Sequence, residues 1–327
     1  MDLFVRPHGA AETAPMSGAI RRFSEVVCLL CLYGVATAQA ATSCKVVDLM
    51  PALWRSLGKS DAAAQVRLAV MDPHPDLYNE NYVDLPPGAK WDASIVSERG
   101  YVEAHRPEVD AAEHYLSVHV QPLMAEFQQT FPDYKCDFTF YIAPSFGQMD
   151  GSAGFVNGQH RIIFAPDVIP RYHKLSELKV LIDHETFHIY HHQSTGVYGA
   201  SAEAVPTTLQ ALWSEGLATF VSWRMNPEVS LDIALLQPGI PEGANPHLAD
   251  IAKDLLAHLD DKDQPTYRHY FVGGSQQPGY PSRAGYYVGT LIAQDLSARY
   301  TLRQLAHLNG PELHGLVVRA LEKLAWH

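Results

Sequence analysis

The chain has 327 residues, a formal net charge of −12 at pH 7 and 47% hydrophobic residues. A chain of this length and apolar content can bury a substantial core, as one large domain or as two lobes. The acidic balance argues against nucleic acid and anionic membrane surfaces as partners, because both are negatively charged. The sequence contains no repeat, charge block or low-complexity stretch. We therefore expect a folded globular protein without stable membrane insertion.

The amino-terminal segment is typical of an export signal. Arg21 and Arg22 precede an apolar run from Val26 to Ala36, and Ala38-Gln39-Ala40 matches a small-x-small cleavage site. The run is too short to cross a bilayer core of about 30 Å as a helix. We expect residues 1–40 to be a signal peptide, and the mature protein to be periplasmic or secreted.

Two cysteines, Cys44 and Cys136, remain after this cleavage. In an oxidising compartment they can form a disulfide. One alternative is that they are two unrelated buried thiols. Another is that Cys44 is lipidated, although Ala41 is a poor match to the large apolar residue usual in lipoprotein signals.

Turn residues and apolar periodicity divide the rest of the chain into elements. Before the histidine motif the pattern predicts a helix near Ser60–Met71, a long loop at Asp72–Lys90, a helix near Pro107–Phe131, a strand at Phe138–Ala143, a loose segment at Gly151–Gly158 and a strand at Arg161–Ala165. From the motif onward it predicts helices at Leu175–Gln193, Thr208–Trp223, His247–Leu259 and Ser282–Ser297, and a helical tail at Thr301–Trp326. Stretches 226–246 and 264–281 are broken by Pro and Gly, and the second is expected to form a mobile rim over a cleft.

The motif His184-Glu185-Thr186-Phe187-His188 lies within the predicted helix Leu175–Gln193, for which Ser176 is the expected N-cap. Residues four apart on a helix point the same way, so His184 and His188 can bind one metal ion. Glu185 lies about 100° around the helix from His184, beside the expected ion, where it can take a proton from a metal-bound water. The alternative is a core helix with two hydrogen-bonded histidines, but burial without a metal leaves polar groups to satisfy.

A catalytic zinc site needs a third protein ligand and an open fourth position. Glu215 is the best remaining donor, on the predicted helix Thr208–Trp223. Gly216 and Ala218 keep one face of that helix narrow, and we expect this face to approach the histidine helix closely. Glu203, in a loop of small residues, is the rival ligand.

Further histidines do not add to this ligand set. His191 and His192 lie one turn past the pair and are expected to point beyond the ion, as surface or supporting residues. A further group of histidines is expected at the surface, because no spacing among them suggests a second metal; they are His105, His114, His119, His160 and His173.

The two motifs together, His184-Glu185-x-x-His188 and Glu215-Gly-Leu-Ala218, resemble those of the gluzincin metallopeptidases. In that group a Glu from a following helix is the third zinc ligand. More narrowly, the chain resembles a bacterial family described as predicted zinc-dependent proteases, which adds Gly-Tyr-x-x-Gly, matched here by Gly285–Gly289. The resemblance covers roughly residues 60 to 325. One position departs from it, because many gluzincins have an Asp that orients a zinc-binding His where this chain has Thr219.

The start of the predicted helix Ser282–Ser297, with Ser282 as its cap, would present Tyr286 or Arg283 to a cleft. Peptide hydrolysis builds negative charge on the carbonyl oxygen, and a phenol or guanidinium aimed there stabilises it. In gluzincins a Tyr or His often has this role, so the resemblance implies Tyr286, with Arg283 as the alternative. A purely packing role for Tyr286 remains open.

We therefore expect an α+β, zincin-like fold, with a small mixed sheet and the histidine helix in an N-terminal α/β lobe of about 41–193, and a mostly helical lobe of about 194–327. The expected function is an exported zinc metallopeptidase with one Zn²⁺ per chain and a peptide or protein substrate. Two alternatives stay open: a zinc hydrolase acting on a non-peptide amide, and a zinc-binding protein without turnover.

Overall fold

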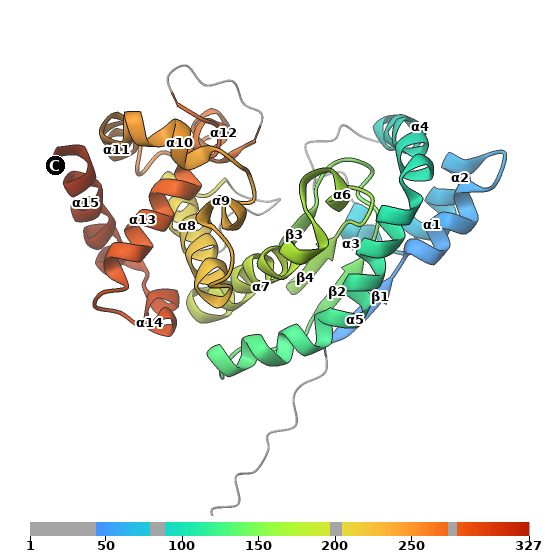
Figure 1. The fold of residues 1–327 in the computed structure, drawn as a ribbon, viewed down its shortest axis with the longest axis horizontal. Helices are drawn as coiled ribbons and strands as arrows, with labels where there is room; N and C mark the ends of the chain where they lie inside the picture. Colours follow the sequence, from blue (N-terminus) through green and yellow to red (C-terminus); the bar gives the residue numbers. More distant parts are fainter. Residues whose placement is uncertain (1–43, 79–88, 197–204, 274–279, 327) are drawn as a thin grey trace, which may run out of the picture. The chain divides into compact units, whose positions relative to one another are not determined.

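Four short strands form a mixed sheet in the computed structural model, which describes residues 44–78, 89–196, 205–273 and 280–326 (Figure 1). The strands are β1 (Lys45–Asp48), β2 (Thr139–Ile142), β3 (Gly151–Val156) and β4 (Gln159–Phe164). β1, β2 and β4 run parallel, and β3 pairs antiparallel with β4. The strand order is β1-β2-β4-β3, so β3 is an edge strand. The expected α+β class with a small mixed sheet is confirmed.

Helices make up most of the remaining described chain. They are α1 (Met50–Leu57), α2 (Ala62–Val66), the π-helix η1 (Arg67–Met71), α3 (Pro75–Tyr78), α4 (Ala89–Ala104), α5 (Arg106–Thr130), α6 (Ile169–Tyr172), the 3-10 helix η2 (Leu175–Glu177), α7 (Leu178–Thr195), α8 (Thr208–Met225), α9 (Leu231–Ala234), α10 (Ile240–Ala244), the 3-10 helix η3 (Asn245–His247), α11 (Leu248–Ala257), α12 (Gln264–Phe271), α13 (Ala284–Leu296), α14 (Leu302–His307) and α15 (Gly310–Trp326).

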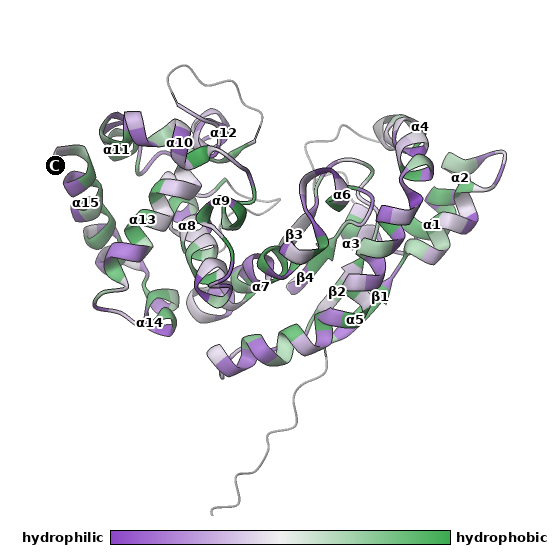
Figure 2. Ribbon diagram, in the orientation of Figure 1, coloured by the Kyte–Doolittle hydropathy of each residue, from purple (hydrophilic) through white to green (hydrophobic). Residues whose placement is uncertain are grey.

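The sheet and two long helices share one apolar core. Phe140 of β2 and Ile162 and Phe164 of β4 are fully buried, as expected for parallel strands covered by helices. α5 and α7 pack against each other, and each also contacts the sheet. Along α5, apolar and polar residues alternate in Figure 2, because this helix buries one face and exposes the other.

Helix α8 connects this core to the helices that follow it. It packs on α7 on one side and on α13 on another (Figure 1). Leu212, Trp213, Leu217 and Phe220 of α8 are buried. The Thr207 hydroxyl accepts a hydrogen bond from the main-chain N–H of Gln210 and so caps the helix. The predicted helix start at Thr208 is confirmed.

A disulfide joins Cys44, just before β1, to Cys136, just before β2, with their Cα atoms 5.2 Å apart. The predicted pairing is confirmed. The bond closes a loop of 92 residues. The chain-entropy model gives a loop of this size about 4–5 kcal/mol of stabilisation, as an upper figure.

Several elements differ from those predicted. The segment Gly151–Gly158 is not loose, because β3 pairs with β4 through an Asn157-Gly158 turn, in which both residues have positive φ. Asn-Gly is the preferred pair for such a hairpin turn, so the sequence did contain this signal. Ser176 is not a helix cap, since it lies inside the short 3-10 helix η2.

Other elements were not predicted at all. They are β1, α1, α4, α6, the short helix α3 within the supposed loop, α9 and α10 within the stretch 226–246, and α12 within the stretch 264–281. The tip of the expected mobile rim, residues 274–279, and the rival ligand Glu203 lie outside the described residues. None of the helices in the described part of the chain has the length and apolar character required to span a membrane.

Candidate metal centre

Three side chains that the sequence placed together do meet in the structure. His184 and His188 project from α7, and Glu215 projects from α8. The Nε2 atoms of the two histidines are 3.1 Å apart. Glu215 Oε2 lies 3.5 Å from the first and 3.3 Å from the second. These residues form a group that could hold a metal ion.

The triangle of donor atoms fits a small tetrahedral cation. Zinc binds nitrogen and oxygen ligands at about 2.0–2.1 Å, and tetrahedral angles then separate two ligand atoms by about 3.3 Å. The three observed separations, 3.1, 3.3 and 3.5 Å, bracket this value. Two imidazoles and one carboxylate are also ligand types that zinc accepts while leaving one position open.

The supporting contacts of the two histidines differ. His188 Nδ1 lies 3.2 Å from the hydroxyl of Ser214, which precedes Glu215 on α8. His184 Nδ1 and the hydroxyl of Thr219 are both buried without a hydrogen-bond partner among the described residues. Thr219 stands where the gluzincin pattern has an orienting Asp, and it makes no hydrogen bond to His184.

Burial and mutual charge govern the ionisation of these ligands. Burial alone would raise the pKa of Glu215, but the two histidines hold it well below its usual range. Burial lowers the pKa of His184 to about 4, with a further lowering contribution from His188. Glu215 is thus a carboxylate and His184 a neutral imidazole, which are the forms that bind a metal.

Glu185 lies beside the ligand group rather than in it. Its Oε2 accepts a hydrogen bond of 2.6 Å from the main-chain N–H of Ala153 on the edge strand β3. Burial, with added repulsion from Glu215 and Asp150, raises its pKa to about 7 despite the nearby His188. A carboxylate with a pKa near neutrality can both accept and return a proton.

Tyr286 and Arg283 line the same cleft as the metal residues. The ring of Tyr286 is stacked on that of His184, with centroids 6.2 Å apart and an interplanar angle of 13°. The Arg283 guanidinium lies 4.0 Å from the centroid of the Tyr286 ring. Both residues predicted at this helix start therefore reach the site.

The backbone at Arg283 differs from the predicted cap. Ser282 does not cap α13; Arg283 occupies the cap position in the left-handed conformation, with φ 61°. This conformation is unfavourable by about 1–2 kcal/mol for a residue with a Cβ. The strain is tolerated at a position where it directs the guanidinium into the cleft.

The glycines near the site have a different role from the one expected. Gly216 does not bring α8 close to α7; it brings α8 against α13. A Cβ on Gly216 would lie 2.2 Å from the carbonyl carbon of Gly289, and a Cβ on Gly289 would lie 2.2 Å from the Leu212 oxygen. A Cβ on Gly285 would lie 2.3 Å from the Phe271 ring. The glycines of Gly285-Tyr-x-x-Gly289 thus permit close packing that places Tyr286 over His184.

The cleft contains residues that the sequence reasoning missed. Its volume is about 460 Å³. Besides the predicted residues its lining includes Asp150 and Ala153 from the sheet edge, and Tyr267 and Phe271 from α12. Asp150 directly precedes strand β3. Its position at this strand boundary was the sequence signal that could have identified it as a cleft residue. α12 was missed because Pro and aromatic residues obscured its helical pattern.

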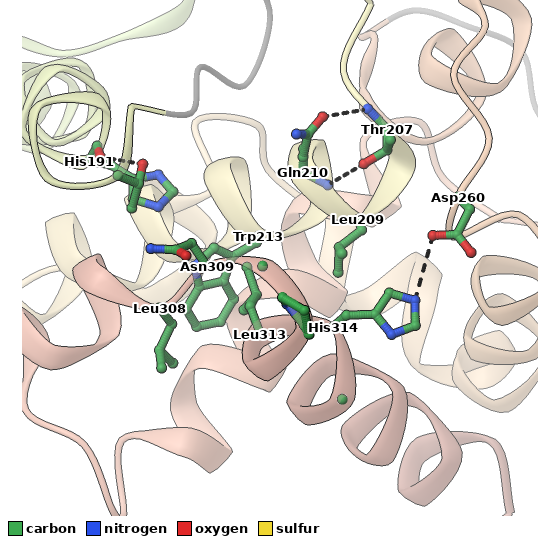
Figure 3. A pocket seen from close by; sticks show the side chains of 14 residues that line it. His191, Thr207, Leu209, Gln210, Trp213, Asp260, Leu308, Asn309, Leu313 and His314 are labelled. Atoms are coloured by element: carbon green, nitrogen blue, oxygen red, sulfur yellow. Dashed lines mark hydrogen bonds and ion pairs between the residues drawn. The ribbon is translucent and has the colours of Figure 1, made fainter.

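The other histidines near the motif are not members of the ligand group in the described part of the chain. His191 is buried and lines a separate pocket of about 490 Å³, shown in Figure 3 with Trp213 and His314. His192 and His160 contact each other, with Nδ1 and Nε2 2.6 Å apart. His173 was expected at the surface, but its side chain is only 4% exposed, and its Nε2 lies 2.6 Å from Asp150 Oδ2.

Comparison of the chain with profiles of known protein families, with curated proteins and with solved structures found no match.

Proposed function

We propose that this protein is an exported zinc metallopeptidase of the zincin-like, gluzincin type, with one Zn²⁺ held by His184, His188 and Glu215. The observation that carries the proposal is the joint placement of a zinc-sized donor triangle and a carboxylate of raised pKa in one cleft. When bound, zinc would acidify a water molecule and polarise the scissile carbonyl.

Glu185 acts as the general base in this proposal. Its carboxylate accepts a proton from the attacking water and later gives the proton to the leaving amine. The pKa of about 7 allows both transfers near neutral pH. The Ala153 N–H fixes one carboxylate oxygen, Oε2, and so leaves the other oxygen, Oε1, to handle the proton.

Tyr286 and Arg283 stabilise the negative charge that develops on the carbonyl oxygen. Burial and the charge of Glu215 raise the pKa of Tyr286 well above its usual value, so the phenol keeps its proton and can donate a hydrogen bond. Arg283 stays cationic, because Tyr286, Glu215 and Asp150 outweigh the effect of burial on its pKa. Stacking on Tyr286 holds the guanidinium in place.

Export is the second part of the proposal. The Cys44–Cys136 disulfide supports it, because disulfides persist in oxidising compartments. Intact mass of the protein from the producing cell should correspond to a chain that begins at Ala41. An acylated Cys44 would contradict this and would place the protein on a membrane anchor.

The variant Glu185→Gln tests the catalytic proposal, because Gln keeps the size of Glu and removes the base. Zinc-loaded wild type should cleave peptides in a diverse library, as followed by mass spectrometry, and the variant should be at least about a hundredfold slower. Zinc content should be the same in both, since Glu185 is not a ligand. Full zinc occupancy without cleavage of any peptide would favour a non-peptide amide substrate or a protein without turnover.

A further inference from the structure

One carboxylate in the cleft has no part in the proposed chemistry. Asp150 stands immediately before the edge strand β3 and lines the same cleft as Glu185 and Arg283. Its side chain is 29% exposed, so it is accessible from the cleft. A Cβ on Gly151, the residue next to Asp150, would lie 3.4 Å from Glu185 Cγ, so Asp150 stands beside the proposed base.

Asp150 is fixed in position. Its Oδ2 lies 2.6 Å from Nε2 of His173, whose side chain is almost fully buried, and its Oδ1 accepts a hydrogen bond of 2.9 Å from the Gly151 N–H. Burial alone would raise the pKa of Asp150, but His173 and Gly151 lower it, so the group is ionised. A carboxylate can accept about four hydrogen bonds, and two of these positions remain for a ligand.

The positively charged Arg283 side chain in the cleft does not neutralise Asp150. Among the described residues no ion pair within 4.0 Å joins Asp150 to Arg283, although each feels the charge of the other. A ligand in the cleft therefore meets a negative group at the start of β3 and a positive group at the start of α13. An ammonium group is attracted to the first and repelled by the second, which sets the direction in which a peptide binds.

We propose that Asp150, positioned by His173, binds the free α-ammonium group of the substrate, so that the enzyme removes residues from the amino terminus of peptides. This inference rests on the proposed peptidase function. Two bonds separate the α-nitrogen from the carbonyl carbon of the first residue, so an α-ammonium on Asp150 brings that carbonyl close to Glu185. The ammonium of a lysine side chain lies several bonds further from its own carbonyl and fits this short spacing less well.

Binding is measured by calorimetry on the zinc-loaded mature Glu185→Gln protein, in which cleavage is suppressed. The probes are two pentapeptides of one sequence without Lys or Arg, one with a free amino terminus and one N-acetylated. The free peptide should bind at least about tenfold more tightly, as expected for a charge-assisted contact in a partly buried site. Equal binding of the two peptides would overturn the proposal. This comparison requires no substitution at Asp150.

Two further variants assign the preference to Asp150. Asp150→Asn, added to the Glu185→Gln protein, should reduce the ratio of the two dissociation constants to about one. Asp250→Asn is the matched control, because it removes the same charge at a side chain that is 78% exposed and outside the cleft lining, and it should keep the ratio. A ratio that persists in Asp150→Asn would contradict the assignment.

The outcomes separate this inference from the peptidase proposal. An N-acetylated pentapeptide that begins with Lys should bind as weakly as the other acetylated peptide; binding equal to the free peptide would show side-chain recognition instead. Wild type that cleaves acetylated peptides internally would leave the peptidase proposal standing and refute the amino-terminal site. A tenfold preference without cleavage of any peptide would refute the peptidase and retain the ammonium site.

Discussion

Substitution of Gly289 by Ala tests how the contact between α8 and α13 builds the site. A Cβ at this position would lie 2.2 Å from the Leu212 oxygen and 2.8 Å from the Gly216 Cα. Ordinary contacts begin at about 3.4 Å, so the two helices must separate by about 1 Å. Both obstructing groups are backbone atoms, which cannot rotate away as a flexible side chain can.

The expected change in stability follows from two opposing contributions. Overpacking of a close contact destabilises by about 1–3 kcal/mol, and backbone obstruction places this site at the upper end. The better helix propensity of Ala returns about 1 kcal/mol. We therefore expect a net loss of about 2 kcal/mol in the free energy of unfolding, or about 4–8 °C in melting temperature. The separation should also weaken zinc binding, because Glu215 is adjacent to Gly216 on α8.

Gly100→Ala is the matched control for this substitution. Gly100 lies within α4, and a Cβ there would meet nothing within 4 Å. This variant should be more stable than wild type by about 0.5–1 kcal/mol, because only the helix propensity changes. Thermal and urea unfolding of both variants provide the assay. If Gly289→Ala were stabilised as much as Gly100→Ala, the inferred helix contact would be wrong.

Three further predictions concern the metal site and its surroundings. Glu215→Ala should release most of the bound zinc on dialysis, as measured by plasma mass spectrometry, and retention of full zinc affinity would contradict its role as ligand. Tyr286→Phe should lower kcat with little change in KM, because its hydrogen bond to the carbonyl oxygen is made mainly in the transition state; a rise in KM alone would contradict that role. Burial, with repulsion from neighbouring histidines, lowers the pKa of His191 to about 3. Between about pH 6.5 and 3, His191 is therefore protonated in the unfolded chain but neutral in the folded protein. The free energy of unfolding should fall as the pH falls through this window. His191→Leu should make this fall shallower in urea unfolding series, and an unchanged slope would contradict the assignment.

The local chemistry of the site could be predicted because it depends on helical spacing. His184 and His188 are one turn apart on a single helix, so their shared direction follows from sequence alone. Glu215 was predicted from its residue type and its place on a following helix, and the structure places it with the histidines. The disulfide was predicted from the expected compartment and the cysteine number, since only one pair remains if the expected leader is removed.

Other features depended on contacts between distant segments. The partner of Gly216 is Gly289 on α13, and no pattern near either residue indicates which helix will approach. Asp150 reaches the cleft because β3 pairs with β4 at the edge of the sheet. The His173 side chain is covered in the fold and contacts Asp150, which lies 23 residues away in the sequence. Such placements are set by tertiary packing and are invisible to local periodicity.

The most direct test of the central claim is anomalous X-ray diffraction at the zinc edge from crystals of the zinc-loaded protein. The account predicts one strong peak per chain, about 2.0–2.1 Å from Nε2 of His184, Nε2 of His188 and a carboxylate oxygen of Glu215. No peak between α7 and α8, or a peak held by other residues, would contradict it.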